Sequence, residues 1–201
     1  MQQVAVKSNK DQDYYSPLID RLTSATQFTE EQVESVREHF RVKRLVKREM
    51  LIAPGTVSNH LYFIASGCMR VFYQDAEKEI TTQFGIEGWC INDLQSFLEQ
   101  KPARQFIQAV EPTVVLQIHR DALQRLNDAV PPFERFMRLK FESAHQVLQE
   151  RHLESILLSA SERYELFRKK YREIEQRVPQ YMVASYLGIT KEFLSHLRSK
   201  N

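Results

Sequence analysis

Cysteine is scarce in this chain of 201 residues, which contains only Cys68 and Cys90. Two cysteines cannot supply the four ligands of an all-cysteine metal cluster. We place the protein in the cytoplasm, where disulfides are rare, so we expect no structural disulfide. With five glycines and seven prolines, the chain also has too few of either residue for a long disordered linker.

Long apolar runs are absent as well. No stretch approaches the roughly eighteen apolar residues of a membrane helix, and the start of the chain has no signal-peptide pattern. No glycine-rich phosphate loop, HExxH, CxxC or nucleophile elbow occurs. We therefore expect a protein without a membrane partner, catalytic residues, a metal site or a cofactor, and predict that it is not an enzyme.

Charge is unevenly distributed along the chain. The hydrophobic fraction of 42% and the charged fraction of 27% are typical of a folded soluble protein. From Ala160 onward there are nine Lys or Arg against five Glu, whereas the first 159 residues hold 19 basic and 21 acidic side chains. A basic excess of this kind favours contact with phosphate, although a solvated helix face would also account for it.

The basic segment ends in a pattern typical of a helix-turn-helix, over residues 178–201. Ala184 is small enough for two helices to cross closely, and Gly188 permits the left-handed backbone of a tight turn. The second helix carries an outward polar face that we predict contacts DNA, with Lys191, Glu192 and His196 at base edges and the others at phosphates. The predicted DNA-binding residues are Thr190, Lys191, Glu192, Ser195, His196, Arg198 and Lys200.

A plain helical hairpin could show the same Ala and Gly spacing, so local signals decide between the two interpretations. Pro179 lies where the first helix would begin, and Thr190 is placed to cap the second. Arg198 and Lys200 fall in the last turn of the second helix, within reach of phosphates.

The first part of the chain predicts helix followed by short strands. Residues 16–46 look helical, and Thr29 with Gln32 has capping-box spacing. Short apolar runs with turns between them then extend to Ile118, and Ile80, Thr82 and Phe84 alternate on one face of a strand. This spacing predicts an antiparallel jelly roll or barrel, and we assign residues 15–130 to one domain. Asp121 is expected to cap a short helix after the strands.

A long helix is predicted over residues 131–158, and Pro131 and Pro132 mark its start. Its apolar residues recur every three or four positions and form a stripe suited to a partner helix. The predicted dimer residues are Phe133, Met137, Phe141, Ala144 and Leu148. Alternatively, the stripe packs against its own domain. The stripe is also short, because Arg151 and Glu154 interrupt its continuation.

The order of β-roll, long helix and helix-turn-helix resembles the Crp–Fnr family of bacterial transcription regulators. Residues 47–55, 61–73 and 184–196 look like the family's glycine turn, its Leu-Tyr strand pair and its DNA-reading unit. The resemblance covers residues 15–200 and implies an α+β fold with a cyclic-nucleotide-binding-like sensor. It also implies a homodimer on double-stranded DNA, with residues 159–201 as the DNA-binding domain. The chain stops just after the second helix, so we expect it to lack most of the family's β-hairpin wing.

The predicted effector pocket departs from the cyclic-nucleotide members of the family. The expected pocket residues are Gly88, Trp89, Cys90, Arg104 and Gln105. Trp89 lies where the ribose-binding Glu should be, and Ala103 takes the place of the phosphate-binding Arg. Arg104 comes one residue late, so strand alternation would turn it out of the pocket unless the preceding loop adjusts. We expect no ordinary cyclic-AMP binding; the pocket either takes an unknown small molecule or is filled by Trp89.

Two further branches of the family have less support. Two cysteines cannot supply the ligands of an iron–sulfur cluster. No sequence pattern marks an axial haem ligand among the available histidines, His60, His119 and His145. Two alternatives to a DNA-binding regulator stay open. The chain could be a ligand-sensing or protein-interaction module with a structural helix-turn-helix, or a fragment of a cyclic-nucleotide-regulated enzyme. The polar, mildly basic face of the second helix favours DNA over the module, and the missing catalytic motifs count against the fragment.

Overall fold

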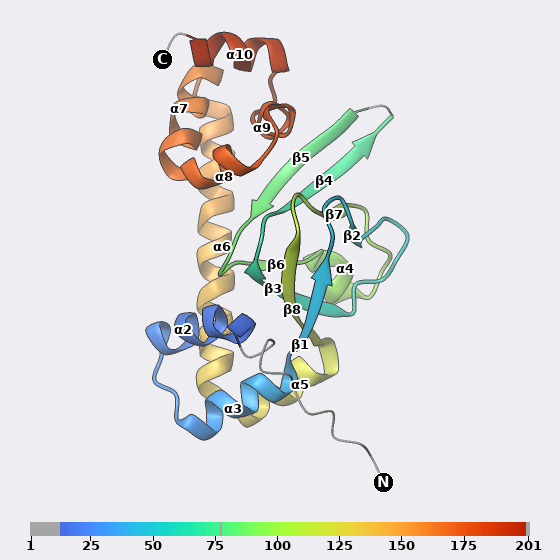
Figure 1. The fold of residues 1–201 in the computed structure, drawn as a ribbon, viewed down its shortest axis with the longest axis vertical. Helices are drawn as coiled ribbons and strands as arrows, with labels where there is room; N and C mark the ends of the chain where they lie inside the picture. The colour runs from blue at the N-terminus through green and yellow to red at the C-terminus, as the bar shows by residue number, and fades with distance from the viewer. Residues whose placement is uncertain (1–12, 77, 200–201) are drawn as a thin grey trace.

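The computed structural model describes residues 13–76 and 78–199, and shows an α+β chain in which one long helix joins a β-roll to a bundle of short helices (Figure 1). This confirms the predicted fold class. The first helices of the chain are η1 (Asp13–Tyr15), α2 (Ser16–Ala25) and α3 (Glu30–His39). None of the helices in the described residues has the length and apolar character needed to cross a membrane.

The β-roll consists of two four-stranded antiparallel sheets, with strand orders β1-β8-β3-β6 and β2-β7-β4-β5. Buried residues such as Ile64, Met69, Ile107 and Val115 form the core shared by strands of both sheets. The strands are β1 (Arg41–Leu45), β2 (Met50–Ile52), β3 (His60–Ser66), β4 (Met69–Asp75), β5 (Lys78–Gly85), β6 (Cys90–Ile91), β7 (Phe106–Ala109) and β8 (Thr113–His119).

The start of the chain corrects one boundary and confirms a cap. The predicted helical region 16–46 is helical only to His39, and β1 then pairs with β8. The capping box is present, because the Gln32 amide donates to the Thr29 hydroxyl and the Thr29 amide donates to the Gln32 side chain. The cap predicted at Asp121 is wrong. Helix α5 (Arg120–Ala129) begins one residue before Asp121, and its N-cap is His119, whose ring nitrogen accepts the Asp121 backbone amide.

The hairpin of β4 and β5 projects from the roll toward the C-terminal helices (Figure 1). Its pairing contains a bulge, since Val71 lies opposite Gln83 whereas Phe72 lies opposite Thr81. The extra residue shifts the alternation of β5, so the predicted common face of Ile80, Thr82 and Phe84 is wrong. Ile80 is exposed, Thr81 is buried instead of Thr82, and Phe84 is buried as expected.

The long helix α6 (Pro131–Leu157) corrects part of the predicted dimer stripe. Phe133 and Met137 are buried in the core of the sensor domain, where they pack with residues of α2, α3 and α5. They are therefore not available to a second chain, because the short helices of the same domain already cover them. Phe141, Ala144 and Leu148 remain exposed.

Exposed apolar side chains also continue past Arg151, contrary to the expectation that the stripe ends there. Arg151 itself points to another face of the helix, where it contacts α9 and β5. The large exposed apolar residues of α6 are Leu139, Phe141, Val147, Leu148, Leu153, Ile156 and Leu157.

Four short helices follow α6 and pack against both α6 and the β4–β5 hairpin (Figure 1). The buried residues of these helices share one cluster with Cys68, Phe84 and Val110 of the β-roll. The two parts of the chain therefore meet through a continuous apolar interface. These helices are α7 (Ala160–Lys170), α8 (Arg172–Arg177), α9 (Gln180–Leu187) and α10 (Lys191–Ser199).

Gly67, in the turn between β3 and β4, should tolerate no larger residue. Its φ is +103°, and an added Cβ would lie 2.7 Å from the Thr113 Cα and 2.8 Å from the Pro112 carbonyl oxygen. We expect Gly67→Ala to lower the free energy of unfolding by about 3 kcal/mol or more, because backbone strain and a backbone clash add. Urea denaturation followed by circular dichroism measures this loss.

Gly55 provides the matched control for Gly67→Ala. Its φ is +88°, but nothing lies within 4 Å of an added Cβ. Gly55→Ala should therefore cost only the strain of a positive φ, about 1–2 kcal/mol. Equal losses for the two variants would contradict the close packing of Gly67 against β8.

Candidate DNA interface and effector pocket

Helices α9 and α10 form the predicted helix-turn-helix. Ala184 is buried in the same cluster as Leu194 and Leu197 of α10, and Gly188 has a φ of +69° in the turn. The Gly188 amide donates to the Ser185 carbonyl and the Ile189 amide to the Ala184 carbonyl, which closes α9. Leu194 and Leu197 are buried and fix α10 to this unit. Both small residues therefore have the roles that the sequence predicted for them.

The predicted DNA-binding residues in the described part of the chain lie at the start of α10 or along it, and Arg198 borders a pocket shared with α7, α8 and α9. Thr190 caps the helix, because its hydroxyl accepts the Phe193 amide at 3.1 Å. The sequence did not single out Phe193, which is 43% exposed on the same helix. Lys200 lies outside the described residues. The remaining predicted residues are all exposed: Thr190, Lys191, Glu192, Ser195, His196 and Arg198.

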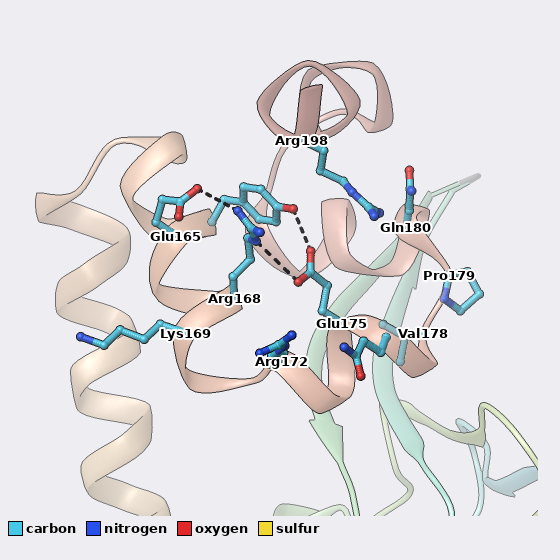
Figure 2. A pocket seen from close by; sticks show the side chains of 11 residues that line it. Glu165, Arg168, Lys169, Arg172, Glu175, Val178, Pro179, Gln180 and Arg198 are labelled. Carbon is cyan, nitrogen blue, oxygen red and sulfur yellow. Dashed lines mark hydrogen bonds and ion pairs between the residues drawn. The ribbon is translucent and has the colours of Figure 1, made fainter. Parts of the chain in front are cut away.

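A basic pocket of about 1040 Å³ lies among α7, α8, α9 and α10 (Figure 2). Four cationic side chains line it, whereas only two carboxylates do; the cations are Arg168, Lys169, Arg172 and Arg198. Arg168 pairs with Glu165 at 3.6 Å and Glu175 at 3.8 Å. Among the described residues, Lys169, Arg172 and Arg198 have no ion-pair partner. They are free to bind an anion from outside the chain.

The carboxylate of Glu175 is also held from within this pocket. The Tyr164 hydroxyl donates to it at 2.7 Å (Figure 2). Burial and this hydrogen bond raise the pKa of Tyr164 to about 12, so the hydroxyl stays protonated and keeps donating. Sequence motifs did not identify Lys169 and Arg172 as site residues. The only signal for them was the basic excess after Ala160.

The candidate effector pocket is the cavity that contains Arg104; it has a volume of about 380 Å³ and lies between the segment around α4 (Leu94–Glu99) and α6. It brings together three of the five predicted residues, Cys90, Arg104 and Gln105, with Phe141 and Leu148 of α6. Arg104 lines this cavity, as its place among the expected pocket residues requires, so strand alternation does not turn it out. Ala103 is the residue that points into the core, where it is 4% exposed. Arg104 has no ion-pair partner among the described residues.

Gly88 and Trp89 do not line the effector pocket. They border a neighbouring cavity, together with residues of α7 and α8. The Trp89 ring meets Tyr171 edge to face, with ring centroids 6.1 Å apart. Trp89 therefore does not fill the effector pocket, and it belongs to the interface with the C-terminal helices.

Arg177 of α8 links the C-terminal helices to the β-roll. It donates to Glu87 at 2.8 and 2.9 Å, and also to Glu111 and Glu173. The second partner of Glu87 is the Gly67 amide at 2.6 Å. Burial alone would raise the pKa of Glu87, but these hydrogen bonds outweigh it and hold the pKa below 4.5. Glu87 therefore stays ionised and paired near neutral pH.

Arg177→Gln should weaken the interface between the two parts of the chain. The variant leaves Glu87 and Glu111 without the cation that they share. Because these groups are partly exposed, we expect the free energy of unfolding to fall by only about 1–2 kcal/mol. Because the folded pKa of Glu87 is lowered, its contribution is present above pH 4.5 and is lost as the pH falls through the folded value. The difference in free energy of unfolding between the variant and the wild type should therefore become smaller at acid pH.

Thermal and urea unfolding between pH 3 and pH 7 would measure this difference. Arg138→Gln is the matched control, since among the described residues Arg138 pairs with Glu142 alone, on the exposed face of α6. It should change stability by no more than about 0.5 kcal/mol. A loss for Arg177→Gln as small as that of the control, at neutral pH, would count against the role of Arg177.

Comparison with known proteins gives a consistent result. Residues 42–129 match the cyclic nucleotide-binding domain family. The anaerobic regulatory protein of Haemophilus influenzae is 26% identical, over 83% of this chain and 68% of its own length. The transcriptional regulatory protein btr of Bordetella pertussis is also 26% identical, over 83% of this chain and 72% of its own. The match to an anaerobic regulatory protein of Pasteurella multocida covers 64% of that protein.

Solved structures share the fold. CooA from Carboxydothermus hydrogenoformans has a TM-score of 0.67 at 22% identity, over 90% of this chain and 82% of its own. The catabolite activator protein of Thermus thermophilus has a TM-score of 0.55 at 21% identity, over 90% of this chain and 85% of its own. The sensor domain, long helix and helix-turn-helix occur here in the order that the resemblance implied. Residues 42–129 thus form a cyclic nucleotide-binding domain, and the chain is similar in sequence and fold to transcription regulators of the Crp–Fnr type.

Proposed function

We propose that the chain is a homodimeric regulator that binds specific DNA sequences through α10, and that its effector pocket does not bind cyclic AMP in the usual way. The main support is the second helix of the helix-turn-helix, which buries its leucines and exposes a polar face. Lys191, Glu192 and His196 would reach base edges in the major groove. This orientation leaves the remaining polar residues at the flanks of the helix, toward phosphates.

Several groups near α10 are suited to phosphate contact. The Thr190 hydroxyl accepts the Phe193 amide, so its own proton remains free to donate to a phosphate oxygen. Ser195 and Arg198 are exposed on α10. The basic pocket adds Lys169 and Arg172, which have no ion-pair partners among the described residues. Unpaired cations bind phosphate without first breaking an internal ion pair, and they make affinity dependent on salt.

The proposal of a homodimer rests on α6. Its middle and C-terminal parts expose large apolar side chains, among them Ile156 at 64% and Leu157 at 73%. Apolar residues spread along an exposed helix favour pairing with an equivalent helix of a second chain. A dimer would present two copies of α10 to two half-sites, as a symmetric operator requires.

The proposal on cyclic AMP rests on the residues of the effector pocket. Trp89 stands where a ribose-binding Glu would be expected, and it faces the C-terminal helices. Arg104 does line the pocket, so an anionic ligand of another kind stays compatible with it. We propose that any effector is a small molecule other than cyclic AMP.

Selection from a pool of random duplexes tests the proposed function. Enrichment of a two-fold symmetric site, without added cyclic AMP, is the expected result. Enrichment that requires cyclic AMP would overturn the proposal on the effector pocket. No enrichment at any salt concentration, with or without cyclic AMP, would contradict DNA binding and favour an interaction module.

Removing the unpaired cations of the basic pocket should weaken the salt dependence of DNA binding. Each lost phosphate contact lowers the slope of log affinity against log salt by about 0.9. The double variant with Lys169→Gln and Arg172→Gln should therefore lower the slope by about 2. The double variant with Arg120→Gln and Arg125→Gln on α5 is the control, because it removes the same charge far from α10 (Figure 1). Equal slopes for the two double variants would contradict the role of the pocket.

His196→Arg should tighten binding to the selected duplex at matched salt. Arg forms a forked pair of hydrogen bonds with guanine, whereas His forms one, so we expect a gain of about 1 kcal/mol, or roughly fivefold in affinity. Fluorescence anisotropy with a labelled duplex measures it. Gln124→Arg on α5 adds the same charge elsewhere and controls for net charge. Unchanged or weaker affinity for His196→Arg would argue against a base contact.

A further inference from the structure

We propose that the cavity beside Trp89 binds a small organic anion with an aromatic or apolar body. This junction cavity has a volume of about 400 Å³ and lies where β5, β6 and α6 meet α7, α8 and α9. It is defined by Arg21, Phe84, Trp89, Lys140, Tyr171 and Tyr186. It adjoins the effector pocket through Cys90, Lys140, Ala144 and Leu148, but Arg104 and the α4 segment take no part in it.

Aromatic rings form much of the wall of the junction cavity. Phe167 lines it, with its ring centroid 5.6 Å from that of Tyr171 and 5.3 Å from that of Tyr186. Phe84 and Trp89 extend the ring cluster toward the β-roll. Rings at these spacings offer faces and edges against which a planar apolar group can pack. The volume is also within the range of small-molecule sites.

The charged groups of the junction cavity are all cationic. Arg21, Lys140 and Arg151 line it, and no carboxylate does. Arg151 already donates to the Thr82 and Tyr186 carbonyls, which are neutral, so its positive charge is not balanced. Arg21 and Lys140 have no ion-pair partner among the described residues. Three cations around an apolar cavity without a carboxylate favour a ligand that carries a negative charge.

Gly88 is needed for this arrangement. Its φ is +82°, and a Cβ there would lie 2.8 Å from the Arg21 Nε. The absent side chain lets the guanidinium of Arg21 approach the backbone at the edge of the cavity. The guanidinium therefore lies at the mouth of the cavity, where Arg21 remains exposed to solvent.

A ligand in this cavity would act on the interface between the two parts of the chain. Phe84 and Trp89 belong to the β-roll, whereas Tyr171 and Tyr186 belong to the C-terminal helices. A ligand that contacts both sides stabilises the docked arrangement by its differential affinity for it. This inference goes beyond the proposed function and does not depend on DNA binding.

Trp89 provides a direct probe of the cavity, since it is the single tryptophan of the chain. The test titrates the DNA-free full chain with 4-iodobenzoate, whose heavy atom quenches tryptophan fluorescence on contact, and with neutral 4-iodobenzamide. We expect saturable quenching by the carboxylate and affinity about tenfold weaker for the amide. Quenching that is linear in concentration for both probes would show collision without a site and would overturn the proposal.

Three variants locate the anion. Arg21→Gln and Lys140→Gln should each weaken carboxylate binding several-fold and leave amide binding nearly unchanged. Arg104→Gln is the matched control, because Arg104 lines only the effector pocket. Loss of binding in Arg104→Gln with no change in Arg21→Gln would place the anion in the effector pocket and overturn the proposal. Lys140 lines both cavities, so its variant reports an anion in either one, and the contrast between Arg21→Gln and Arg104→Gln decides which cavity holds it.

Discussion

The exposed edge of β5 is the constraint on which the arrangement of the two parts depends. β5 is the last strand of its sheet, so its outer backbone groups have no neighbouring strand to bind. Ser185 of α9 takes that place: its hydroxyl accepts the Thr81 amide at 2.8 Å and donates to the Glu79 carbonyl at 2.7 Å. Arg151 of α6 donates to the Thr82 carbonyl and stacks over Tyr186, its guanidinium carbon 3.8 Å from the ring centroid. The helix-turn-helix is thus fixed to the sensor by satisfied backbone groups.

Other features follow from this docking. Once α9 is held on the hairpin, Phe84 and Tyr186 come together, with ring centroids 5.4 Å apart, and Arg177 reaches Glu87. The outer face of α10 is left pointing away from the β-roll (Figure 1). The same helix α6 supplies Arg151 to the interface and apolar residues to solvent on another face. A signal that changes α6 or β5 would therefore reach α10 through few contacts.

Local chemistry made much of the fold predictable from the sequence. The roles of Gly188 as turn, Ala184 as crossing and Thr29 as cap depend on neighbours within a few residues, and all are confirmed. Predictions that depended on distant packing were less successful. The bulge in the β4–β5 pair shifted the face of Ile80, and α2, α3 and α5 bury Phe133 and Met137. Likewise, the ring partner of Trp89 is Tyr171, which lies 82 residues away, just before α8. No local sequence pattern could therefore predict the position of Trp89.

Hydrogen exchange at the Thr81 amide tests the central claim most directly. In the full chain without DNA, docking of α9 through Ser185 predicts that this edge amide exchanges slowly. Ser185→Ala should make its exchange much faster. Amides inside the sheet, such as that of Val71, should stay protected in the variant. An amide at Thr81 that exchanges in the wild type as fast as a solvent-exposed strand edge, and is unaffected by Ser185→Ala, would contradict the docked arrangement.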